Sequence, residues 1–163
     1  MDIIQIVGYK NSGKTTVATT FIEYATKKGI RTASLKHHGH GGIPEGIKDT
    51  DSEKHRLAGA IISGVEGGSV FQLSKENWTV DEMIPIYNMM HIDLLIMEGF
   101  KSYPFPKVLL ISRKEELDLL DQVENVQAII TRVALEKNSY PFPVFHSFEI
   151  NRICKWLEGQ LKK

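Results

Sequence analysis

Short runs of apolar residues alternate along this chain with polar segments of helical composition. The first run covers 3–7 (IIQIV), and the segment 16–28 after it is predicted to form a helix that ends at Gly29. Consecutive apolar residues are typical of parallel strands that are buried on both faces. Further strands are predicted over 31–35, 94–97, 107–112, 126–131 and 144–146. The pattern therefore predicts an α/β fold, with a mainly parallel sheet flanked by helices.

Residues 51–90 follow a different pattern. Residues 51–60 are predicted to form a short helix, with Ser52 or Asp51 as its N-cap. Arg56 is either an anion contact or a solvated helix residue, and the second is favoured. Residues 61–65 and 70–73 are predicted to be two strands joined by a tight glycine turn, an antiparallel hairpin near 61–73. Helices are expected over 82–90 and, as an amphipathic element, over 148–161.

Length and composition predict one nucleotide-binding domain over residues 1–163. Twenty basic residues balance twenty acidic ones, so we expect no general attraction to nucleic acid or to an anionic membrane. No apolar run approaches the roughly 20 residues that a membrane span needs, and a strand begins too early for a signal peptide. The single Cys154 excludes an internal disulfide. A soluble, cytoplasmic protein is expected.

The segment between the first strand and the first helix fits the phosphate-binding pattern G-x-x-x-x-G-K-[ST], known as the P-loop. Glycines let the backbone N–H groups approach a polyphosphate closely, and the following helix N-terminus adds positive charge. Lys14 is expected to reach the β- and γ-phosphates, and the Thr15 hydroxyl to bind Mg²⁺. The predicted nucleotide-binding residues of this segment are Gly8, Tyr9, Lys10, Asn11, Ser12, Gly13, Lys14, Thr15 and Thr16.

Glu98 closes the apolar strand 94–97. An acidic residue at that place in a P-loop protein is the Walker B carboxylate, which holds Mg²⁺ through water or positions the attacking water. The sequence leaves Asp51 open between a helix cap and a second carboxylate that orders the metal or the water. The predicted catalytic residues are therefore Lys14, Glu98 and Asp51, and the predicted metal ligands are Thr15, Glu98 and Asp51.

Lys36 and three histidines, His37, His38 and His40, follow the second predicted strand. Strand ends of this kind hold ligands in doubly wound folds, so Lys36 and His37 are predicted to contact the nucleotide. Imidazole is also a common ligand of zinc, nickel and copper, but no cysteine pair accompanies these histidines. A loop that contacts nucleotide or partner is favoured over a metal site.

Four segments together closely resemble the molybdopterin-guanine dinucleotide biosynthesis protein B (MobB) family, over nearly the whole chain. They are 7–16 (VGYKNSGKTT), 35–38 (LKHH), 51–60 (DSEKHRLAGA) and 95–101 (LIMEGFK). The resemblance implies a homodimeric accessory protein that binds GTP and hydrolyses it weakly. It also implies assistance to the guanylyltransferase MobA, which attaches GMP to molybdopterin in molybdenum cofactor assembly.

Two positions depart from related patterns. Tyr9 stands where dimeric NTPases of the MinD type carry a signature lysine, with Lys10 one place later. Arg132 follows the strand 126–131, where guanine-binding proteins often have N-K-x-D. The guanine preference therefore rests on the resemblance. A P-loop kinase of small molecules and a nickel or zinc metallochaperone GTPase remain the alternative functions.

Overall fold

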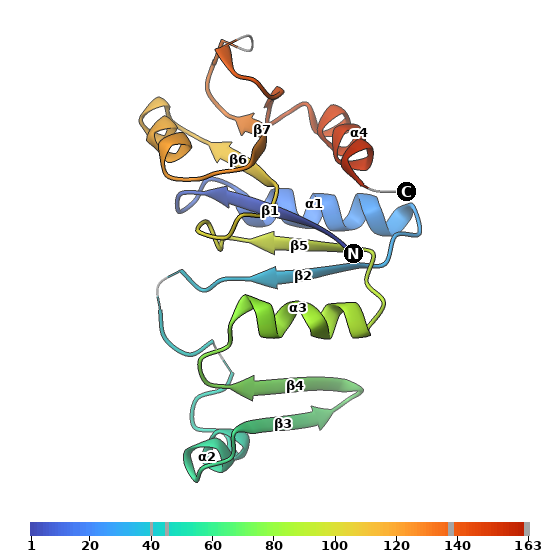
Figure 1. The fold of residues 1–163 in the computed structure, drawn as a ribbon, viewed down its shortest axis with the longest axis vertical. Coiled ribbons are helices and arrows are strands. Elements are labelled where there is room, and N and C mark those ends of the chain that lie inside the picture. The colour runs from blue at the N-terminus through green and yellow to red at the C-terminus, as the bar shows by residue number, and fades with distance from the viewer. Residues whose placement is uncertain (40, 45, 137–138, 162–163) are drawn as a thin grey trace. The chain divides into compact units, whose positions relative to one another are not determined.

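The computed structural model describes residues 1–39, 41–44, 46–136 and 139–161. Its main sheet has six parallel strands in the order β2-β5-β1-β6-β7-β8, as Figure 1 partly shows. The strands are β1 (Asp2–Gly8), β2 (Thr32–Lys36), β5 (Leu94–Glu98), β6 (Lys107–Ile111), β7 (Val126–Thr131) and β8 (Val144–His146). The α/β fold with a mainly parallel sheet, expected from the apolar runs, is confirmed.

Two layers of apolar side chains cover the sheet because successive residues of a strand point to opposite faces. On one face, Ile4 and Ile6 of β1 pack with α1 (Lys14–Lys27) and α4 (Ile150–Gln160) around the fully buried Phe21. On the other face, Val7 packs near Leu119 of the 3₁₀ helix η1 (Lys114–Asp121). The η1 helix was not predicted, because its KEELDLLD sequence lacks a long apolar repeat.

The chain divides into two compact units, one of residues 1–37 and 87–163 and one of residues 38–86. The first contains the parallel sheet, and helix α3 (Val80–Met89) begins in the second and ends in the first. The expectation of one domain over 1–163 stays a prediction. Observed element bounds differ from the predicted ones by a few residues at most, as with α1, which begins at Lys14 and not at Thr16.

The second unit contains α2 (Asp51–Leu57) and the antiparallel pair β3 (Ile62–Gly67) and β4 (Val70–Lys75). The hairpin predicted near 61–73 is confirmed, but the N-cap of α2 is Thr50 and neither Ser52 nor Asp51. The Thr50 hydroxyl accepts a hydrogen bond from the backbone N–H of Glu53 at 3.2 Å. A cap oxygen bonds to the N–H three residues later, and only Thr50 has this geometry.

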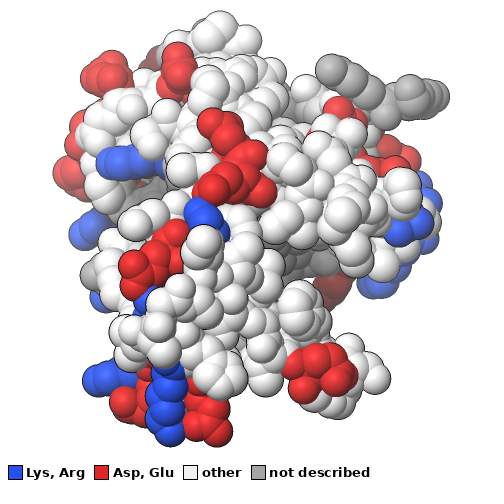
Figure 2. Space-filling model, turned by 60° about the horizontal axis from the view of Figure 1, so that its bottom comes forward, with Lys and Arg blue, Asp and Glu red and all other residues white. Residues whose placement is uncertain are grey.

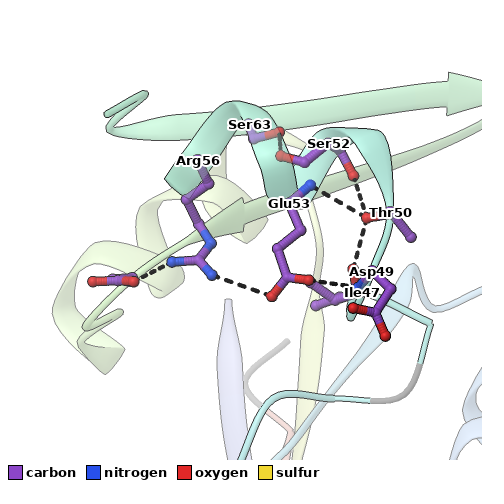
Figure 3. Close-up of polar contacts among 8 residues, drawn as sticks. Ile47, Asp49, Thr50, Ser52, Glu53, Arg56 and Ser63 are labelled. Carbon is purple, nitrogen blue, oxygen red and sulfur yellow. Dashed lines mark hydrogen bonds and ion pairs between the residues drawn. The ribbon is translucent and has the colours of Figure 1, made fainter. Parts of the chain in front are cut away.

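Arg56 is an interior residue of the second unit, which corrects the expectation of a solvated side chain. Its guanidinium lies between the carboxylates of Glu53 and Glu76. Figure 3 shows the guanidinium pointing toward Glu53. The Arg56 and Glu53 side chains are only 10% and 9% exposed, whereas Glu76 is 68% exposed. Glu53 also accepts a hydrogen bond from the backbone N–H of Asp49 at 2.6 Å. Glu53 therefore pairs with Arg56 within α2 and also joins this helix to the loop before it.

The face of the molecule in Figure 2 carries acidic and basic side chains in small clusters of both signs, separated by uncharged surface. Among the described residues, no helix has the length and apolarity that crossing a membrane requires.

Candidate phosphate-binding site

The loop between β1 and α1 is a tight turn that requires glycine at two places. Gly13 is the N-cap residue of α1 and has a φ of +94°, a left-handed conformation that side chains disfavour. At Gly8 a Cβ atom would lie 2.6 Å from the Ser12 Oγ and 2.9 Å from the Leu110 carbonyl oxygen. The two glycines of the motif are therefore fixed by local geometry. The strand, loop and helix predicted around the motif are all present.

Lys14, the first residue of α1, folds its side chain back over this loop. Its Nζ donates hydrogen bonds to the carbonyl oxygens of Gly8 at 3.0 Å and Tyr9 at 2.7 Å. Burial lowers the pKa of this ammonium, and Lys36 lowers it further, while Glu98 acts in the opposite direction. A cation is thus held above the turn, where the P-loop pattern places the lysine that binds phosphate.

Thr15, Lys36 and Glu98 meet at the carboxyl ends of the strands. The Thr15 Oγ1 donates to the Glu98 carboxylate, at 3.0 and 3.1 Å from its two oxygens. Lys36 and Glu98 are paired in register, and the Lys36 Nζ lies 3.2 Å from Glu98 Oε1 and 3.3 Å from Thr15 Oγ1. A hydroxyl, a carboxylate and an ammonium from three elements therefore share one small site.

The oxygens of Thr15 and Glu98 fit the chemistry of Mg²⁺. Adjacent ligands of an octahedral Mg²⁺ ion lie about 3 Å apart, because each is at about 2.1 Å from the metal and at right angles to its neighbour. The Thr15 hydroxyl and the Glu98 carboxylate already have that separation. These two residues could hold the ion directly or through water. The ammonium of Lys36 occupies the same oxygens, so a metal would compete with it.

The Ser12 hydroxyl supports a ligand at the loop. Ser12 is 4% exposed, and its Oγ has no hydrogen-bond partner among the described residues. A buried hydroxyl without a partner is costly and calls for an explanation such as a bound ligand or water. The other predicted loop residues Lys10, Asn11, Thr15 and Thr16 are exposed, which leaves the loop surface accessible.

The structure gives His37 and Asp51 other partners. The His37 backbone N–H donates to the Glu98 carbonyl oxygen at 2.9 Å, and its ring packs against Phe100 with centroids 5.1 Å apart. Asp51 belongs to the second unit, where its exposed carboxylate pairs with Lys54 at 2.8 Å. The roles predicted for His37 with nucleotide and for Asp51 with metal or water stay predictions.

The metal site considered for the histidine loop has no counterpart among the described residues. The described part of the chain contains no group of three or more His, Cys, Asp or Glu side chains that could hold a metal ion. His40, one of the three histidines that suggested such a site, lies outside the described residues.

Sequence reasoning missed the contacts that three residues make at this edge of the sheet. Gln5 of β1 donates to the carbonyl oxygens of Gly99 at 3.4 Å and Phe100 at 2.7 Å, and so fixes the loop after Glu98. The Tyr9 hydroxyl donates to Asp118 of η1 at 3.0 Å. No sequence signal indicated either contact, because both join segments about a hundred residues apart.

Arg132 is the third missed residue, and it lies against the P-loop. A Cβ atom on Gly13 would be 2.7 Å from an Nη atom of Arg132. The available signal was the place of Arg132 directly after a predicted strand, but the residue was noted only as a departure from N-K-x-D.

Comparisons with known proteins agree with the resemblance noted in the sequence. The family described as "Molybdopterin guanine dinucleotide synthesis protein B", MobB, matches residues 3–132. A probable molybdopterin-guanine dinucleotide biosynthesis adapter protein of Bacillus subtilis is 41% identical over 164 residues, which cover 97% of this chain and 94% of the relative. A corresponding adapter protein of Haemophilus influenzae is 28% identical over 137 residues, 82% of this chain and 76% of the relative.

Solved structures give the same result for the fold. The crystal structure of Bacillus subtilis MobB superposes with a TM-score of 0.83 at 36% identity and covers 99% of both chains. The MobB homologue of Bacillus stearothermophilus gives a TM-score of 0.78 at 30% identity, with 98% of this chain and 97% of the other covered.

Proposed function

This chain belongs to the molybdopterin guanine dinucleotide synthesis protein B (MobB) family, and on that premise we propose that it is a GTP-binding adapter protein of molybdenum cofactor biosynthesis. In this proposal it assists a MobA-type guanylyltransferase in converting molybdopterin to molybdopterin guanine dinucleotide in the cytoplasm. Its own GTPase activity is slow at most. The observation that carries the nucleotide part is the grouping of Lys14, Thr15 and Glu98 around a loop of P-loop sequence.

Each residue has a separate role in holding the nucleotide. The loop N–H groups and the helix N-terminus of α1 bind the phosphates, and the Lys14 ammonium exchanges its carbonyl partners for phosphate oxygens. Thr15 and Glu98 would hold Mg²⁺, which neutralises charge on the phosphates when bound. Glu98, the last residue of β5, also orders the water that attacks the γ-phosphate.

Slow turnover follows from which groups the site contains. Fast P-loop GTPases use a glutamine to orient the attacking water and an arginine finger to stabilise the transition state. Among the described residues, the side chains that bond to the Glu98 carboxylate are those of Thr15 and Lys36, and neither is a glutamine or an arginine. A nucleotide-dependent adapter does not need rapid hydrolysis, because binding alone changes the loop that a partner contacts.

A homodimer is part of the same proposal, and the second unit offers support for an association surface. The hairpin β3–β4 and its flanks expose several large apolar side chains, which are Ile61, Ile62, Val65, Val70, Phe71 and Leu73. Exposed apolar groups of this kind are typical of interaction surfaces. Light scattering of the wild type and of Val70→Lys tests this: a dimer that becomes monomeric in the variant supports the hairpin as its interface, and a monomeric wild type refutes the dimer.

Calorimetric titration of GTP and ATP, each with Mg²⁺, into the wild type and Lys14→Ala tests the nucleotide proposal. We expect GTP binding that is lost in Lys14→Ala and ATP binding that is much weaker. Lys27→Ala is the matched control, since Lys27 lies at the other end of the same helix. Equal or tighter ATP binding would refute the guanine assignment and favour a P-loop kinase, and binding unaffected by Lys14→Ala would refute the site itself. Addition of a MobA-type enzyme and molybdopterin then tests whether GTP increases dinucleotide formation.

A further inference from the structure

Arg132 has a backbone that is fixed from three sides. It directly follows β7, and its N–H donates to the Ile111 carbonyl oxygen of β6 at 2.9 Å. The preceding Thr131 closes a turn, because its Oγ1 accepts from the backbone N–H of Val133 at 3.0 Å. The Thr131 carbonyl oxygen accepts from the N–H of Ser147, after β8, at 2.8 Å. The root of the Arg132 side chain is therefore held firmly at the carboxyl edge of the sheet.

The tip of this side chain lies at an unfavourable place for a cation. Its guanidinium is packed against Gly13, the N-cap residue of α1, where the helix dipole is positive. Within the described part of the chain, no carboxylate forms an ion pair with Arg132. Arg132 is an exposed residue, so solvent compensates its charge and its guanidinium stays accessible to a ligand on the P-loop.

The sheet order indicates which end of a bound nucleotide Arg132 would meet. Strand β1 leads into the loop, with β5 as its neighbour on one side and β6 followed by β7 on the other. Glu98 of β5 and Lys36 of β2 stand with Thr15 on the first side, so the metal and the γ-phosphate belong there. A nucleotide whose phosphates lie along the loop then directs its nucleoside toward the β6–β7 side, where Arg132 lies.

Two aromatic rings lie at and just after the end of β8, the strand next to β7. His146 pairs with Thr131 in register, and its ring stacks on the exposed Phe148 with centroids 4.1 Å apart. Arg132 adds a guanidinium, which is planar and weakly hydrated and stacks well on aromatic rings. Planar groups bind a base through its face without requiring an N-K-x-D sequence.

We propose that Arg132 is the base-contacting residue of this site, stacking its guanidinium on the purine of the nucleotide whose phosphates the P-loop holds. The inference rests on the proposed nucleotide binding and adds to it a residue for the nucleoside end. Lys14 holds the phosphates, and Arg132 increases affinity only for ligands that carry a base. The departure from N-K-x-D at this position is then a different solution to the same task.

The test compares a ligand with a base and a ligand without one. GTP and inorganic tripolyphosphate, each with Mg²⁺, are titrated calorimetrically into the wild type, Arg132→Ala and Arg132→Lys. We expect Arg132→Ala to weaken GTP binding about tenfold and tripolyphosphate binding less than about twofold, because stacking on a base is worth about 1–3 kcal/mol. Arg132→Lys should also weaken GTP binding, since an ammonium keeps the charge but has no planar face.

Lys114→Ala is the control, because Lys114 is an exposed cationic residue that begins η1, shortly after the adjacent strand β6. This control variant should bind GTP and tripolyphosphate as tightly as the wild type does. Thermal unfolding of each variant checks that the fold persists. Equal losses for GTP and tripolyphosphate would overturn the inference in favour of a phosphate contact, and no loss for either would also overturn it. If Lys14→Ala still abolishes binding in those cases, the nucleotide proposal stands without Arg132. A wild type that binds neither ligand would refute both.

Discussion

The Lys36 ammonium lies 3.2 Å from Glu98 Oε1, so the carboxylate predicted to hold magnesium already has a cationic partner. The pair joins two neighbouring parallel strands at the residues where both end. The Glu98 side chain is 11% exposed, whereas Lys36 is 58% exposed and can move away into solvent. Lys36 is thus placed to compensate the charge of Glu98 when no metal is bound, and to leave when one binds.

We predict that Lys36→Met binds Mg²⁺ more tightly, because the metal no longer competes with an ammonium for the oxygens of Thr15 and Glu98. The Mg²⁺ concentration for half-maximal GTP binding should fall about threefold to tenfold, in line with the modest energy of a half-exposed ion pair. A magnesium titration of fluorescent GTP binding measures it. Lys101→Met serves as the control, because Lys101 is an exposed lysine shortly after β5, the strand that ends at Glu98. A midpoint that stays constant or rises would argue against competition.

Phosphate binding should weaken at alkaline pH earlier than an ordinary lysine would allow. Burial lowers the pKa of Lys14, so its ammonium loses the proton below the usual value of about 10.4. The protonated form attracts phosphate, and affinity for tripolyphosphate therefore falls as pH rises through that lowered pKa. Lys14→Arg should not show this decline, since a guanidinium stays charged. Calorimetry from about pH 7.5 to 10 measures both profiles.

The lowered pKa of Lys14 makes the free energy of unfolding change with pH in the opposite direction to phosphate affinity. A lysine whose pKa is lowered by folding releases its proton first in the folded state, so the unfolded state binds more protons between the two pKa values. The contribution of Lys14 to the free energy of unfolding therefore rises with pH in that interval. Thermal unfolding measured alongside binding separates the two effects, and an affinity that stays flat up to about pH 10 would contradict the prediction.

Removal of the Arg56 guanidinium should destabilise the second unit. Arg56→Met leaves the buried Glu53 carboxylate without its charged partner, which costs about 3–5 kcal/mol. Urea unfolding gives the overall change, and hydrogen exchange of the α2 amides locates it. Glu76→Gln is the control, because Glu76 is 68% exposed and its loss should cost less than about 1 kcal/mol. Similar losses for the two variants would show that the burial of Glu53 is not the cause.

Phe21 of α1 should be a principal contributor to stability. It is fully buried between the sheet and helices α1 and α4, so Phe21→Ala removes a ring and leaves a cavity. The free energy of unfolding should fall by about 3–5 kcal/mol. Phe148→Ala, at a side chain that is 77% exposed, should change it by no more than about 0.5 kcal/mol. Denaturant unfolding of both variants measures the contrast.

The sequence by itself determined the features that depend on a few neighbouring residues. The P-loop, the strand before it and the helix after it follow from local spacing, as does the position of Glu98 at a strand end. Apolar runs determined the parallel strands, because a strand buried on both faces has no polar alternation. The hairpin followed from two short β-branched runs around a glycine turn.

Only the tertiary structure decided which of these segments meet. The order of strands places Lys36 beside Glu98 and brings Arg132 from β7 to the P-loop, and local patterns do not encode that order. The Arg56 side chain is buried and pairs with Glu53 and Glu76, although the sequence of its helix is polar. The physical reason for the contacts of Lys36 and Arg132 is that they join residues distant in the chain, and their geometry depends on packing of the whole sheet and on its register.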